Sequence, residues 1–215
     1  KNSKKLTTTS KRMVSFYKKY TGKNIQLVRN GIDELKFYKI KKIKRHPKSI
    51  LYVGKKEKGL EHIVRLSLLM NDYSFMIAGP IKQSDIKNIN GGYISNNLEL
   101  HGVLNSDELN KLYNASTYCV FPSKFDNFPL VGLEAMSTSS VVISGYKGFS
   151  EYIDGKNGIA IPNINAGKIY KVIKFLEEKN DLREKIIERG LKTSKEYYNR
   201  NVFEGYTKIY KSIIQ

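Results

Sequence analysis

Short runs of apolar residues alternate along the chain with longer stretches whose apolar positions recur at a helical period. The short runs are almost continuous in apolar character and rich in β-branched and aromatic residues, which is typical of strands covered on both faces of a parallel sheet. The predicted strands span residues 24–28, 49–54, 73–79, 98–102, 118–123, 141–145 and 158–162.

The helical stretches fill the intervals between these strands and the C-terminal tail. Leu60, Ile63 and Leu68 fall on one helical face, and a second helix is expected to begin at an N-cap, Ser106. Strands that alternate with helices in this way predict an α/β fold with a doubly wound, Rossmann-like parallel sheet and right-handed crossovers. The remaining helices are expected over residues 131–138, 165–178, 181–197 and 201–214.

The length of 215 residues suits one α/β domain. Residues 1–22 are basic, rich in threonine and weakly patterned, and we expect them to be a connector or the edge of a missing N-terminal domain. Residues 23–215 are expected to form the Rossmann-like domain and its C-terminal helices. The chain starts at Lys1 and not at Met, which favours a piece of a longer protein. No apolar stretch approaches the ~20 residues of a membrane-spanning helix.

Composition narrows the classes of partner and site. Thirty-eight Lys and Arg residues against twenty Asp and Glu give a net charge of +18, which indicates nucleic acid, an anionic membrane surface or a phosphorylated small molecule as partner. A single cysteine excludes a disulfide framework and a Cys-rich zinc site, and the three histidines lack metal-ligand spacing. A basic run over residues 39–48 is most simply interpreted as a solvated loop.

Two strand-to-helix junctions carry groups that suit a phosphorylated ligand, because ligands of open parallel sheets bind at the carboxyl ends of the strands. Residues 53–60, VGKKEKGL, bring lysines next to the free N–H groups of a helix start, which together favour an anion. In residues 124–136, KFDNFPLVGLEAM, seven residues separate Asp126 from Glu134. The Glu134 carboxylate lies about one turn inside the expected helix, where it can accept hydrogen bonds from a diol such as a ribose.

A third junction follows the predicted strand 141–145. Gly145 and Gly148 allow the loop there to pass close to a ligand or to another backbone segment. These junctions and the segments around them resemble, in order, the C-terminal half of the retaining GT-B glycosyltransferases of group 1 (family 4), which use nucleotide-sugar donors. The similar segments are RNGID, VGKKEKG, MIAGP, LHGVLNSDELNKLYNASTYCVFPS, KFDNFPLVGLEAM, GYKGFSEYI and DGKNGIAI, from about Val28 to the end of the chain.

The resemblance implies three catalytic residues and a ribose-binding residue. Lys55 and Lys58 correspond to the family's Arg and Lys that hold the donor diphosphate and stabilise its charge as it leaves. Asp126 corresponds to the first acidic position of the donor motif and faces the sugar ring. Glu134 corresponds to the second acidic position and binds the ribose hydroxyls. Asp126 stands where the family has Glu and Lys55 where it has Arg, and residues 137–142 lack the family's Gly and Pro.

The resemblance also implies backbone contacts to the donor. The remaining donor-binding residues are Gly54, Gly79, Val103, Leu104, Phe128, Pro129 and Leu130. Among them, the backbone at Gly79 and around Val103 and Leu104 frames the base, whereas the amides around Phe128–Leu130 lie near the sugar and phosphate. No cofactor and no divalent metal is implied, because lysines and a helix end supply the positive charge. The donor is expected to be a UDP- or GDP-sugar.

The implied function is retaining transfer of a hexose from that donor to a polysaccharide or lipid-linked acceptor, in bacterial cell-surface polysaccharide synthesis. We expect a cytoplasmic protein that also associates with the anionic inner face of the membrane. The missing N-terminal domain would supply the acceptor site, so this chain alone is expected to bind the donor but to transfer nothing.

Two alternatives stay open at this point. The charge would suit a basic α/β module that binds nucleic acid, although the lysines are spread over the whole length and no helix-turn-helix, RRM or zinc signature is visible. A GT-B-like sugar-nucleotide epimerase or a phosphorylase would share the fold, but no lysine stands in a pyridoxal-phosphate context.

Overall fold

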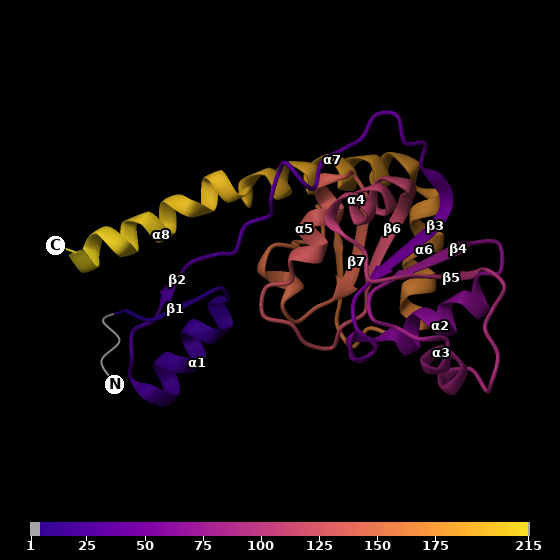
Figure 1. Cartoon of the computed structure of the whole chain (residues 1–215), viewed down its shortest axis with the longest axis horizontal. Coiled ribbons are helices and arrows are strands. Elements are labelled where there is room, and N and C mark those ends of the chain that lie inside the picture. Colours follow the sequence, from indigo (N-terminus) through magenta and orange to yellow (C-terminus); the bar gives the residue numbers. More distant parts are fainter. Residues whose placement is uncertain (1–4, 215) are drawn as a thin grey trace.

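Parallel strands in the order β5-β4-β3-β6-β7-β8 form the central sheet of the molecule (Figure 1). The computed structural model describes residues 5–214. The strand order reverses between β3 and β6, so the sheet is doubly wound and its switch point lies between these two strands. The strands are β3 (His46–Val53), β4 (Ser74–Ala78), β5 (Leu98–Gly102), β6 (Ser116–Phe121), β7 (Val141–Gly145) and β8 (Ile159–Ile161).

Helices cover both faces of this sheet, which confirms the predicted fold class. In β3, the fully buried Ile50 and Tyr52 pack on one face and Leu51 packs on the other, as the two-residue period of a strand requires. The first face is covered by α2 (Leu60–Leu69), α3 (Gln83–Ile89) and α6 (Ala166–Glu178). The second face is covered by α4 (Ser106–Ala115) and α5 (Leu130–Ser137), and α7 (Asn180–Glu196) packs against both α5 and α6.

Three sequence-based expectations about local structure were wrong. The predicted strand 24–28 contributes only β2 (Gln26–Leu27), which pairs with β1 (Thr7–Thr8) outside the central sheet. The N-cap of α4 is Asn105 and not Ser106, because the Asn105 side chain accepts hydrogen bonds from the N–H groups of Asp107 and Glu108, both at 3.0 Å. The segment taken as weakly patterned contains α1 (Lys11–Thr21), an 11-residue helix with no buried residue.

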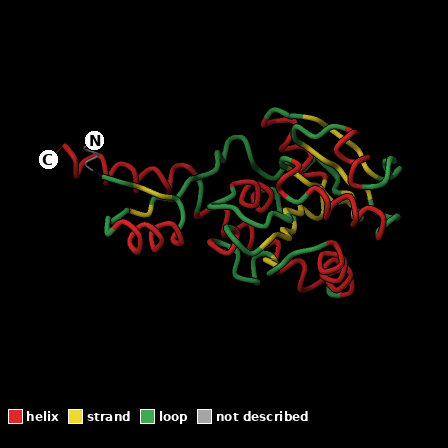
Figure 2. Tube along the Cα trace, turned by 90° about the horizontal axis from the view of Figure 1, so that it is seen from below, coloured by secondary structure: helices red, strands yellow, loops and turns green. Residues whose placement is uncertain are grey.

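The N-terminal elements and the last helix extend away from the sheet. Figures 1 and 2 show α8 (Asn199–Ile214) continuing past α7 and reaching over β1, β2 and α1. Two contacts hold it there: Gly205 lies against Val28, and the Tyr206 hydroxyl lies 3.5 Å from Asn30 Oδ1. Whether residues 1–22 form a connector or the edge of another domain stays a prediction, and residues 1–4 lie outside the described part.

Within residues 5–214, no helix combines the length and the apolar character that crossing a membrane requires.

Candidate functional site

Backbone contacts between glycines bring the ends of three neighbouring strands together. The Gly54 N–H donates to the Ala78 carbonyl at 3.0 Å, and the Gly79 N–H donates to the Gly102 carbonyl at 2.7 Å. Gly79 has φ +136°, and a Cβ atom there would lie 2.0 Å from the Gly54 carbonyl oxygen, so only glycine fits. Val103, which is largely exposed, follows at the same edge of the sheet. The predicted backbone positions around Gly54, Gly79, Val103 and Leu104 therefore do lie at one edge.

The lysines of the first junction differ in their contacts. A short 3₁₀ helix, η1 (Lys56–Lys58), follows β3 and presents the Lys58 ammonium 2.9 Å from Asp126 Oδ2 and 3.3 Å from the Phe125 carbonyl. The Lys55 side chain is exposed and has no hydrogen-bond or ion-pair partner in residues 5–214. The structure thus joins two of the predicted catalytic residues, Lys58 and Asp126, and leaves the third, Lys55, free to meet a ligand nearby.

Aromatic packing fixes the turn that leads into α5. Phe128 is buried, with its ring centroid 5.4 Å from those of Tyr152 and Tyr197. The Tyr152 hydroxyl donates to the Pro129 carbonyl at 2.6 Å. Pro129 is the N-cap of α5 and has no N–H, so the free N–H groups of the first turn begin at Leu130. That the amides around Phe128–Leu130 contact the donor stays a prediction. No acidic residue occupies that turn, which leaves the positive helix end open to an anion.

Glu134 lies half-buried one turn into α5. Its Oε2 accepts a hydrogen bond from the Tyr113 hydroxyl at 3.0 Å. Burial raises the pKa of Glu134 to about 7, although the hydrogen bond from Tyr113 acts in the opposite direction. Burial, and then the charges of Glu134 and Asp126, raise the pKa of Tyr152. The charges of both carboxylates therefore act on the same buried phenol.

Sequence reasoning missed the contacts of Glu151. Its carboxylate accepts hydrogen bonds from Arg29 Nη2 and from the Ser10 hydroxyl, both at 2.8 Å. Burial raises the pKa of Glu151, but these hydrogen bonds lower it by more, so the net shift is downward. The Arg29 guanidinium also lies 4.8 Å from the centroid of the Phe128 ring. The N-terminal segment is thereby tied to the loops of the candidate site. Nothing in the sequence spacing signals a pair that is 122 residues apart.

The described residues offer neither a metal site nor a reactive thiol. No group of three His, Cys, Asp or Glu side chains among them could hold a metal ion. Cys119 is buried in β6, and burial raises the pKa of its thiol to about 12, so it is a small core residue. The prediction that donor binding needs no metal stays a prediction.

Comparison with known proteins decides the family. Residues 33–193 match the model of the family described as glycosyl transferases group 1. The chain belongs to this family. Two uncharacterized glycosyltransferases of Methanocaldococcus jannaschii are similar to it. MJ1178 is 29% identical over 147 residues, covering 66% of this chain and 41% of its own length. MJ1607 is 29% identical over 174 residues, covering 76% of this chain and 45% of its own length.

Solved structures give the same fold. Sucrose-phosphate synthase from Thermosynechococcus elongatus superimposes with a TM-score of 0.85 at 18% identity, covering 99% of this chain and 59% of that one. HepE of Anabaena in complex with UDP and glucose gives a TM-score of 0.83 at 13% identity, covering 98% of this chain and 64% of that one. This group 1 glycosyltransferase chain is the C-terminal half of a GT-B fold. It spans less than half the length of its two archaeal relatives.

Family membership favours the glycosyltransferase prediction over the nucleic-acid-binding alternative. The assignment of individual donor-binding residues stays a prediction, since it depends on ligand contacts and not on the fold.

Proposed function

We propose that this chain is the donor-binding half of a retaining glycosyltransferase and that it holds a UDP- or GDP-sugar at the switch point between β3 and β6. One observation supports this most strongly: the Lys58–Asp126 ion pair bridges the β3 and β6 junctions next to the uncapped N-terminus of α5. Cations from one junction and free helix N–H groups from the other then face a single anionic ligand.

The proposed roles follow from what each group can donate or accept. Lys58, with Lys55 beside it, binds the diphosphate together with the N–H groups that begin at Leu130. Because the departing diphosphate gains negative charge, these donors stabilise the transition state more than the bound donor, which accelerates transfer. Asp126 accepts a hydrogen bond from the sugar, and Glu134 accepts hydrogen bonds from the ribose.

The edge formed by Gly54, Gly79, Val103 and Leu104 receives the base. No metal takes part in this proposal, since the lysines and the end of α5 provide the positive charge. Two proteins of similar structure support a nucleotide-sugar ligand: HepE was solved with UDP-glucose, and the pneumococcal O-GlcNAc transferase GtfA was solved with UDP and GlcNAc.

Transfer itself requires more than this chain. Because the match covers only 41% and 45% of the two curated relatives, we infer that a second domain supplies the acceptor site and that the present chain binds donor without transferring a hexose. A polysaccharide or lipid-linked acceptor at the cytoplasmic face of a bacterial membrane would account for the net charge of +18, since each basic residue near an anionic surface contributes ~1 kcal/mol.

A thermal-shift panel tests this proposal. UDP, GDP, UDP-glucose and GDP-mannose are each added to the wild-type chain and to Glu134→Gln, with Glu178→Gln as control because Glu178 is exposed on α6. Stabilisation by at least one nucleotide, reduced only in Glu134→Gln, supports the proposal. If no nucleotide stabilises the chain but duplex DNA binds with a steep salt dependence, the nucleic-acid alternative replaces it. Binding to anionic vesicles that is no tighter than to neutral ones would remove the membrane part.

A further inference from the structure

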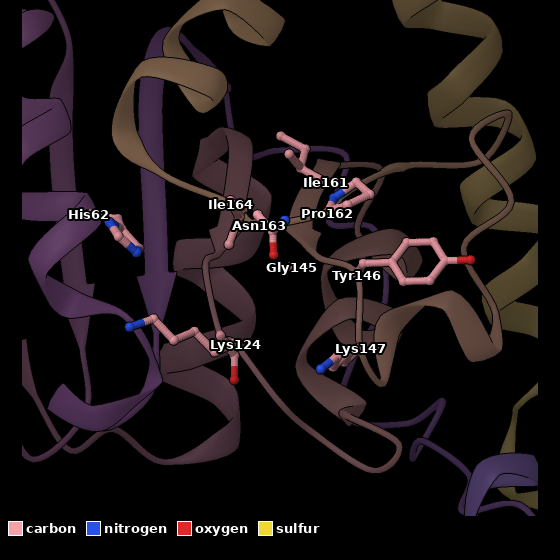
Figure 3. Close-up of a pocket in the computed structure, with 10 residues that line it drawn as sticks. His62, Lys124, Gly145, Tyr146, Lys147, Ile161, Pro162, Asn163 and Ile164 are labelled. Carbon is pink, nitrogen blue, oxygen red and sulfur yellow. The ribbon is translucent and has the colours of Figure 1, made fainter.

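A pocket of about 430 Å³ opens at the carboxyl ends of β6, β7 and β8, next to the first turn of α2 (Figure 3). This volume lies within the roughly 300–1,000 Å³ of small-molecule sites. No residue assigned above to the donor is among the described residues that line the pocket. Its lining consists of His62, Ser123, Lys124, Gly145, Tyr146, Lys147, Ile161, Pro162, Asn163 and Ile164.

The charged groups of this pocket favour an anion. Lys124 and Lys147 contribute ammonium groups, and none of the described lining residues is acidic. The Glu61 carboxylate lies 3.8 Å from the Lys124 ammonium. Because the Glu61 side chain is itself half-exposed, it screens the positive charge of the pocket only in part. Two ammonium groups without an acidic residue in the lining make the pocket electropositive, which favours a phosphate.

An unpaired imidazole nitrogen supplies a second, independent sign of a ligand. The Nε2 atom of His62 is buried and has no hydrogen-bond partner in residues 5–214. Glu61 Oε1 lies 3.6 Å away, which is beyond hydrogen-bond distance. Buried polar atoms almost always have a hydrogen-bond partner in folded proteins. We therefore expect His62 Nε2 to form a hydrogen bond with a group that the chain does not provide. Figure 3 shows His62 and Lys124 on one side of the pocket and Tyr146 and Lys147 on the other.

Most of the remaining lining of the pocket is apolar, with Ser123 and Asn163 as its polar residues. Ile161, Pro162 and Ile164 provide aliphatic surface, and Tyr146 provides a half-exposed ring, which together suit the C–H face of a sugar ring. The Lys168 ammonium donates to the carbonyls of Pro162 and Asn163, at 2.9 and 3.1 Å, and so holds the β8–α6 turn in place. Gly145 lies against the Ser123 backbone: a Cβ atom on Gly145 would lie only 2.0 Å from the Ser123 carbonyl oxygen. This wall of the pocket therefore has no room to move inward.

We propose that this pocket is a second ligand site, for a small sugar that carries a phosphate group. Lys124 and Lys147 hold the phosphate, His62 Nε2 hydrogen-bonds a ring hydroxyl, and the ring packs on Ile164 and Tyr146. This binding does not rest on the proposed donor function, because the two sites share no lining residue.

The pocket is connected to the loop that carries Asp126. The Asp126 N–H donates to the Lys147 carbonyl at 3.1 Å, and the Ser123 hydroxyl donates to the Phe125 carbonyl at 2.9 Å. A ligand that pulls Lys124 and Lys147 together therefore acts on the backbone that positions Asp126 opposite Lys58. We expect occupancy of the pocket to change the affinity for the nucleotide, and by reciprocity the nucleotide to change the affinity of the pocket equally.

Calorimetric titration of the full 215-residue chain with glucose 6-phosphate, glucose and inorganic phosphate tests the site. Glucose 6-phosphate is expected to bind more tightly than either component alone, and Lys124→Met/Lys147→Met is expected to weaken it at least tenfold. Lys55→Met, which alters the proposed donor site, should leave this affinity unchanged. His62→Phe should weaken glucose 6-phosphate but leave inorganic phosphate unaffected, which separates the roles of the imidazole and the ammonium groups.

The outcomes that overturn this proposal are specific. Equal affinity for glucose 6-phosphate and inorganic phosphate would overturn the sugar-ring contacts, and undiminished binding by the double lysine variant would overturn the location. Competition between saturating UDP and glucose 6-phosphate for one site would show that the sugar phosphate occupies the donor site instead. UDP binding without any glucose 6-phosphate binding would refute the second site and leave the donor function intact.

Discussion

The Lys58 ammonium lies 2.9 Å from the Asp126 carboxylate and so joins two strand-to-helix junctions that are 68 residues apart in the chain. In the absence of a donor each side chain neutralises the other. A diphosphate carries more negative charge than one carboxylate and would compete for Lys58, which would release Asp126 to accept a hydrogen bond from the sugar.

Lys58→Met is expected to weaken UDP binding about tenfold. The variant loses a charge-assisted hydrogen bond of ~1.5–3 kcal/mol, and the exposure of the Lys58 side chain to solvent reduces that value. Lys56→Met is the matched control: Lys56 lies in the same 3₁₀ helix but pairs with Asp85 at 3.4 Å. Calorimetry at fixed ionic strength measures both. Equal losses in the two variants would indicate a general charge effect and not a diphosphate contact.

Glu134→Gln is expected to stabilise the chain at high pH. Because the pKa of Glu134 is raised from its ordinary value of 4.5 to about 7 in the folded chain, the folded form keeps a proton that the unfolded form has lost between these pH values. The unfolding free energy therefore falls as pH rises through this window, by up to about 3 kcal/mol.

Urea unfolding at pH 4 and at pH 8 checks this sign. The wild-type chain should lose stability relative to Glu134→Gln at pH 8 and should match it at pH 4. A variant that is less stable than the wild type at pH 8 would show that Glu134 is ionised and well satisfied in the folded chain.

Ser139→Gly is expected to raise the unfolding free energy by about 1 kcal/mol. Ser139 has φ +67°, a left-handed conformation that costs a non-glycine residue ~1–2 kcal/mol. Its buried hydroxyl has no partner in residues 5–214. Ser140→Gly is the control and should destabilise, because the Ser140 hydroxyl donates to the Tyr113 carbonyl at 2.8 Å. Thermal melts of the two variants should therefore shift in opposite directions, and a parallel shift would contradict the strain at Ser139.

Glu151→Ala is expected to destabilise the chain by about 3 kcal/mol, because it leaves the largely buried Arg29 without its counter-ion. It should also loosen the attachment of the N-terminal segment through Ser10. Hydrogen exchange of the α1 and β2 amides measures that loosening. Glu188→Ala, on an exposed position of α7, should alter neither property by a measurable amount. Unchanged exchange in Glu151→Ala would mean that other contacts hold this segment.

Local patterns predicted most of the central sheet. Strands 98–102 and 141–145 have the predicted bounds, since each is an apolar run that ends at a glycine. The helix α1 was missed although its apolar residues Met13, Phe16 and Tyr20 recur at a helical spacing, because the segment was interpreted from its basic, threonine-rich composition. The strand at 24–28 was misplaced because a run of apolar residues does not indicate which sheet the strand joins.

The candidate site was predictable only as far as its residues lie in continuous motifs. Gly54, Lys58, Asp126 and Glu134 belong to such segments. The contact of Glu134 does not follow from these segments: Tyr113, in the segment LHGVLNSDELNKLYNASTYCVFPS, reaches it from α4, and nothing in the sequence indicates that its hydroxyl does so. The raised pKa of Glu134 comes from burial, which becomes visible only once the helices are packed.

A crystal structure of this chain with UDP tests the central claim most directly. The account predicts that the diphosphate lies within hydrogen-bond distance of Lys58 Nζ and of the first N–H groups of α5, with the ribose hydroxyls on the Glu134 carboxylate. A nucleotide bound elsewhere, with the Lys58–Asp126 pair still closed and Glu134 in contact only with Tyr113, would contradict it.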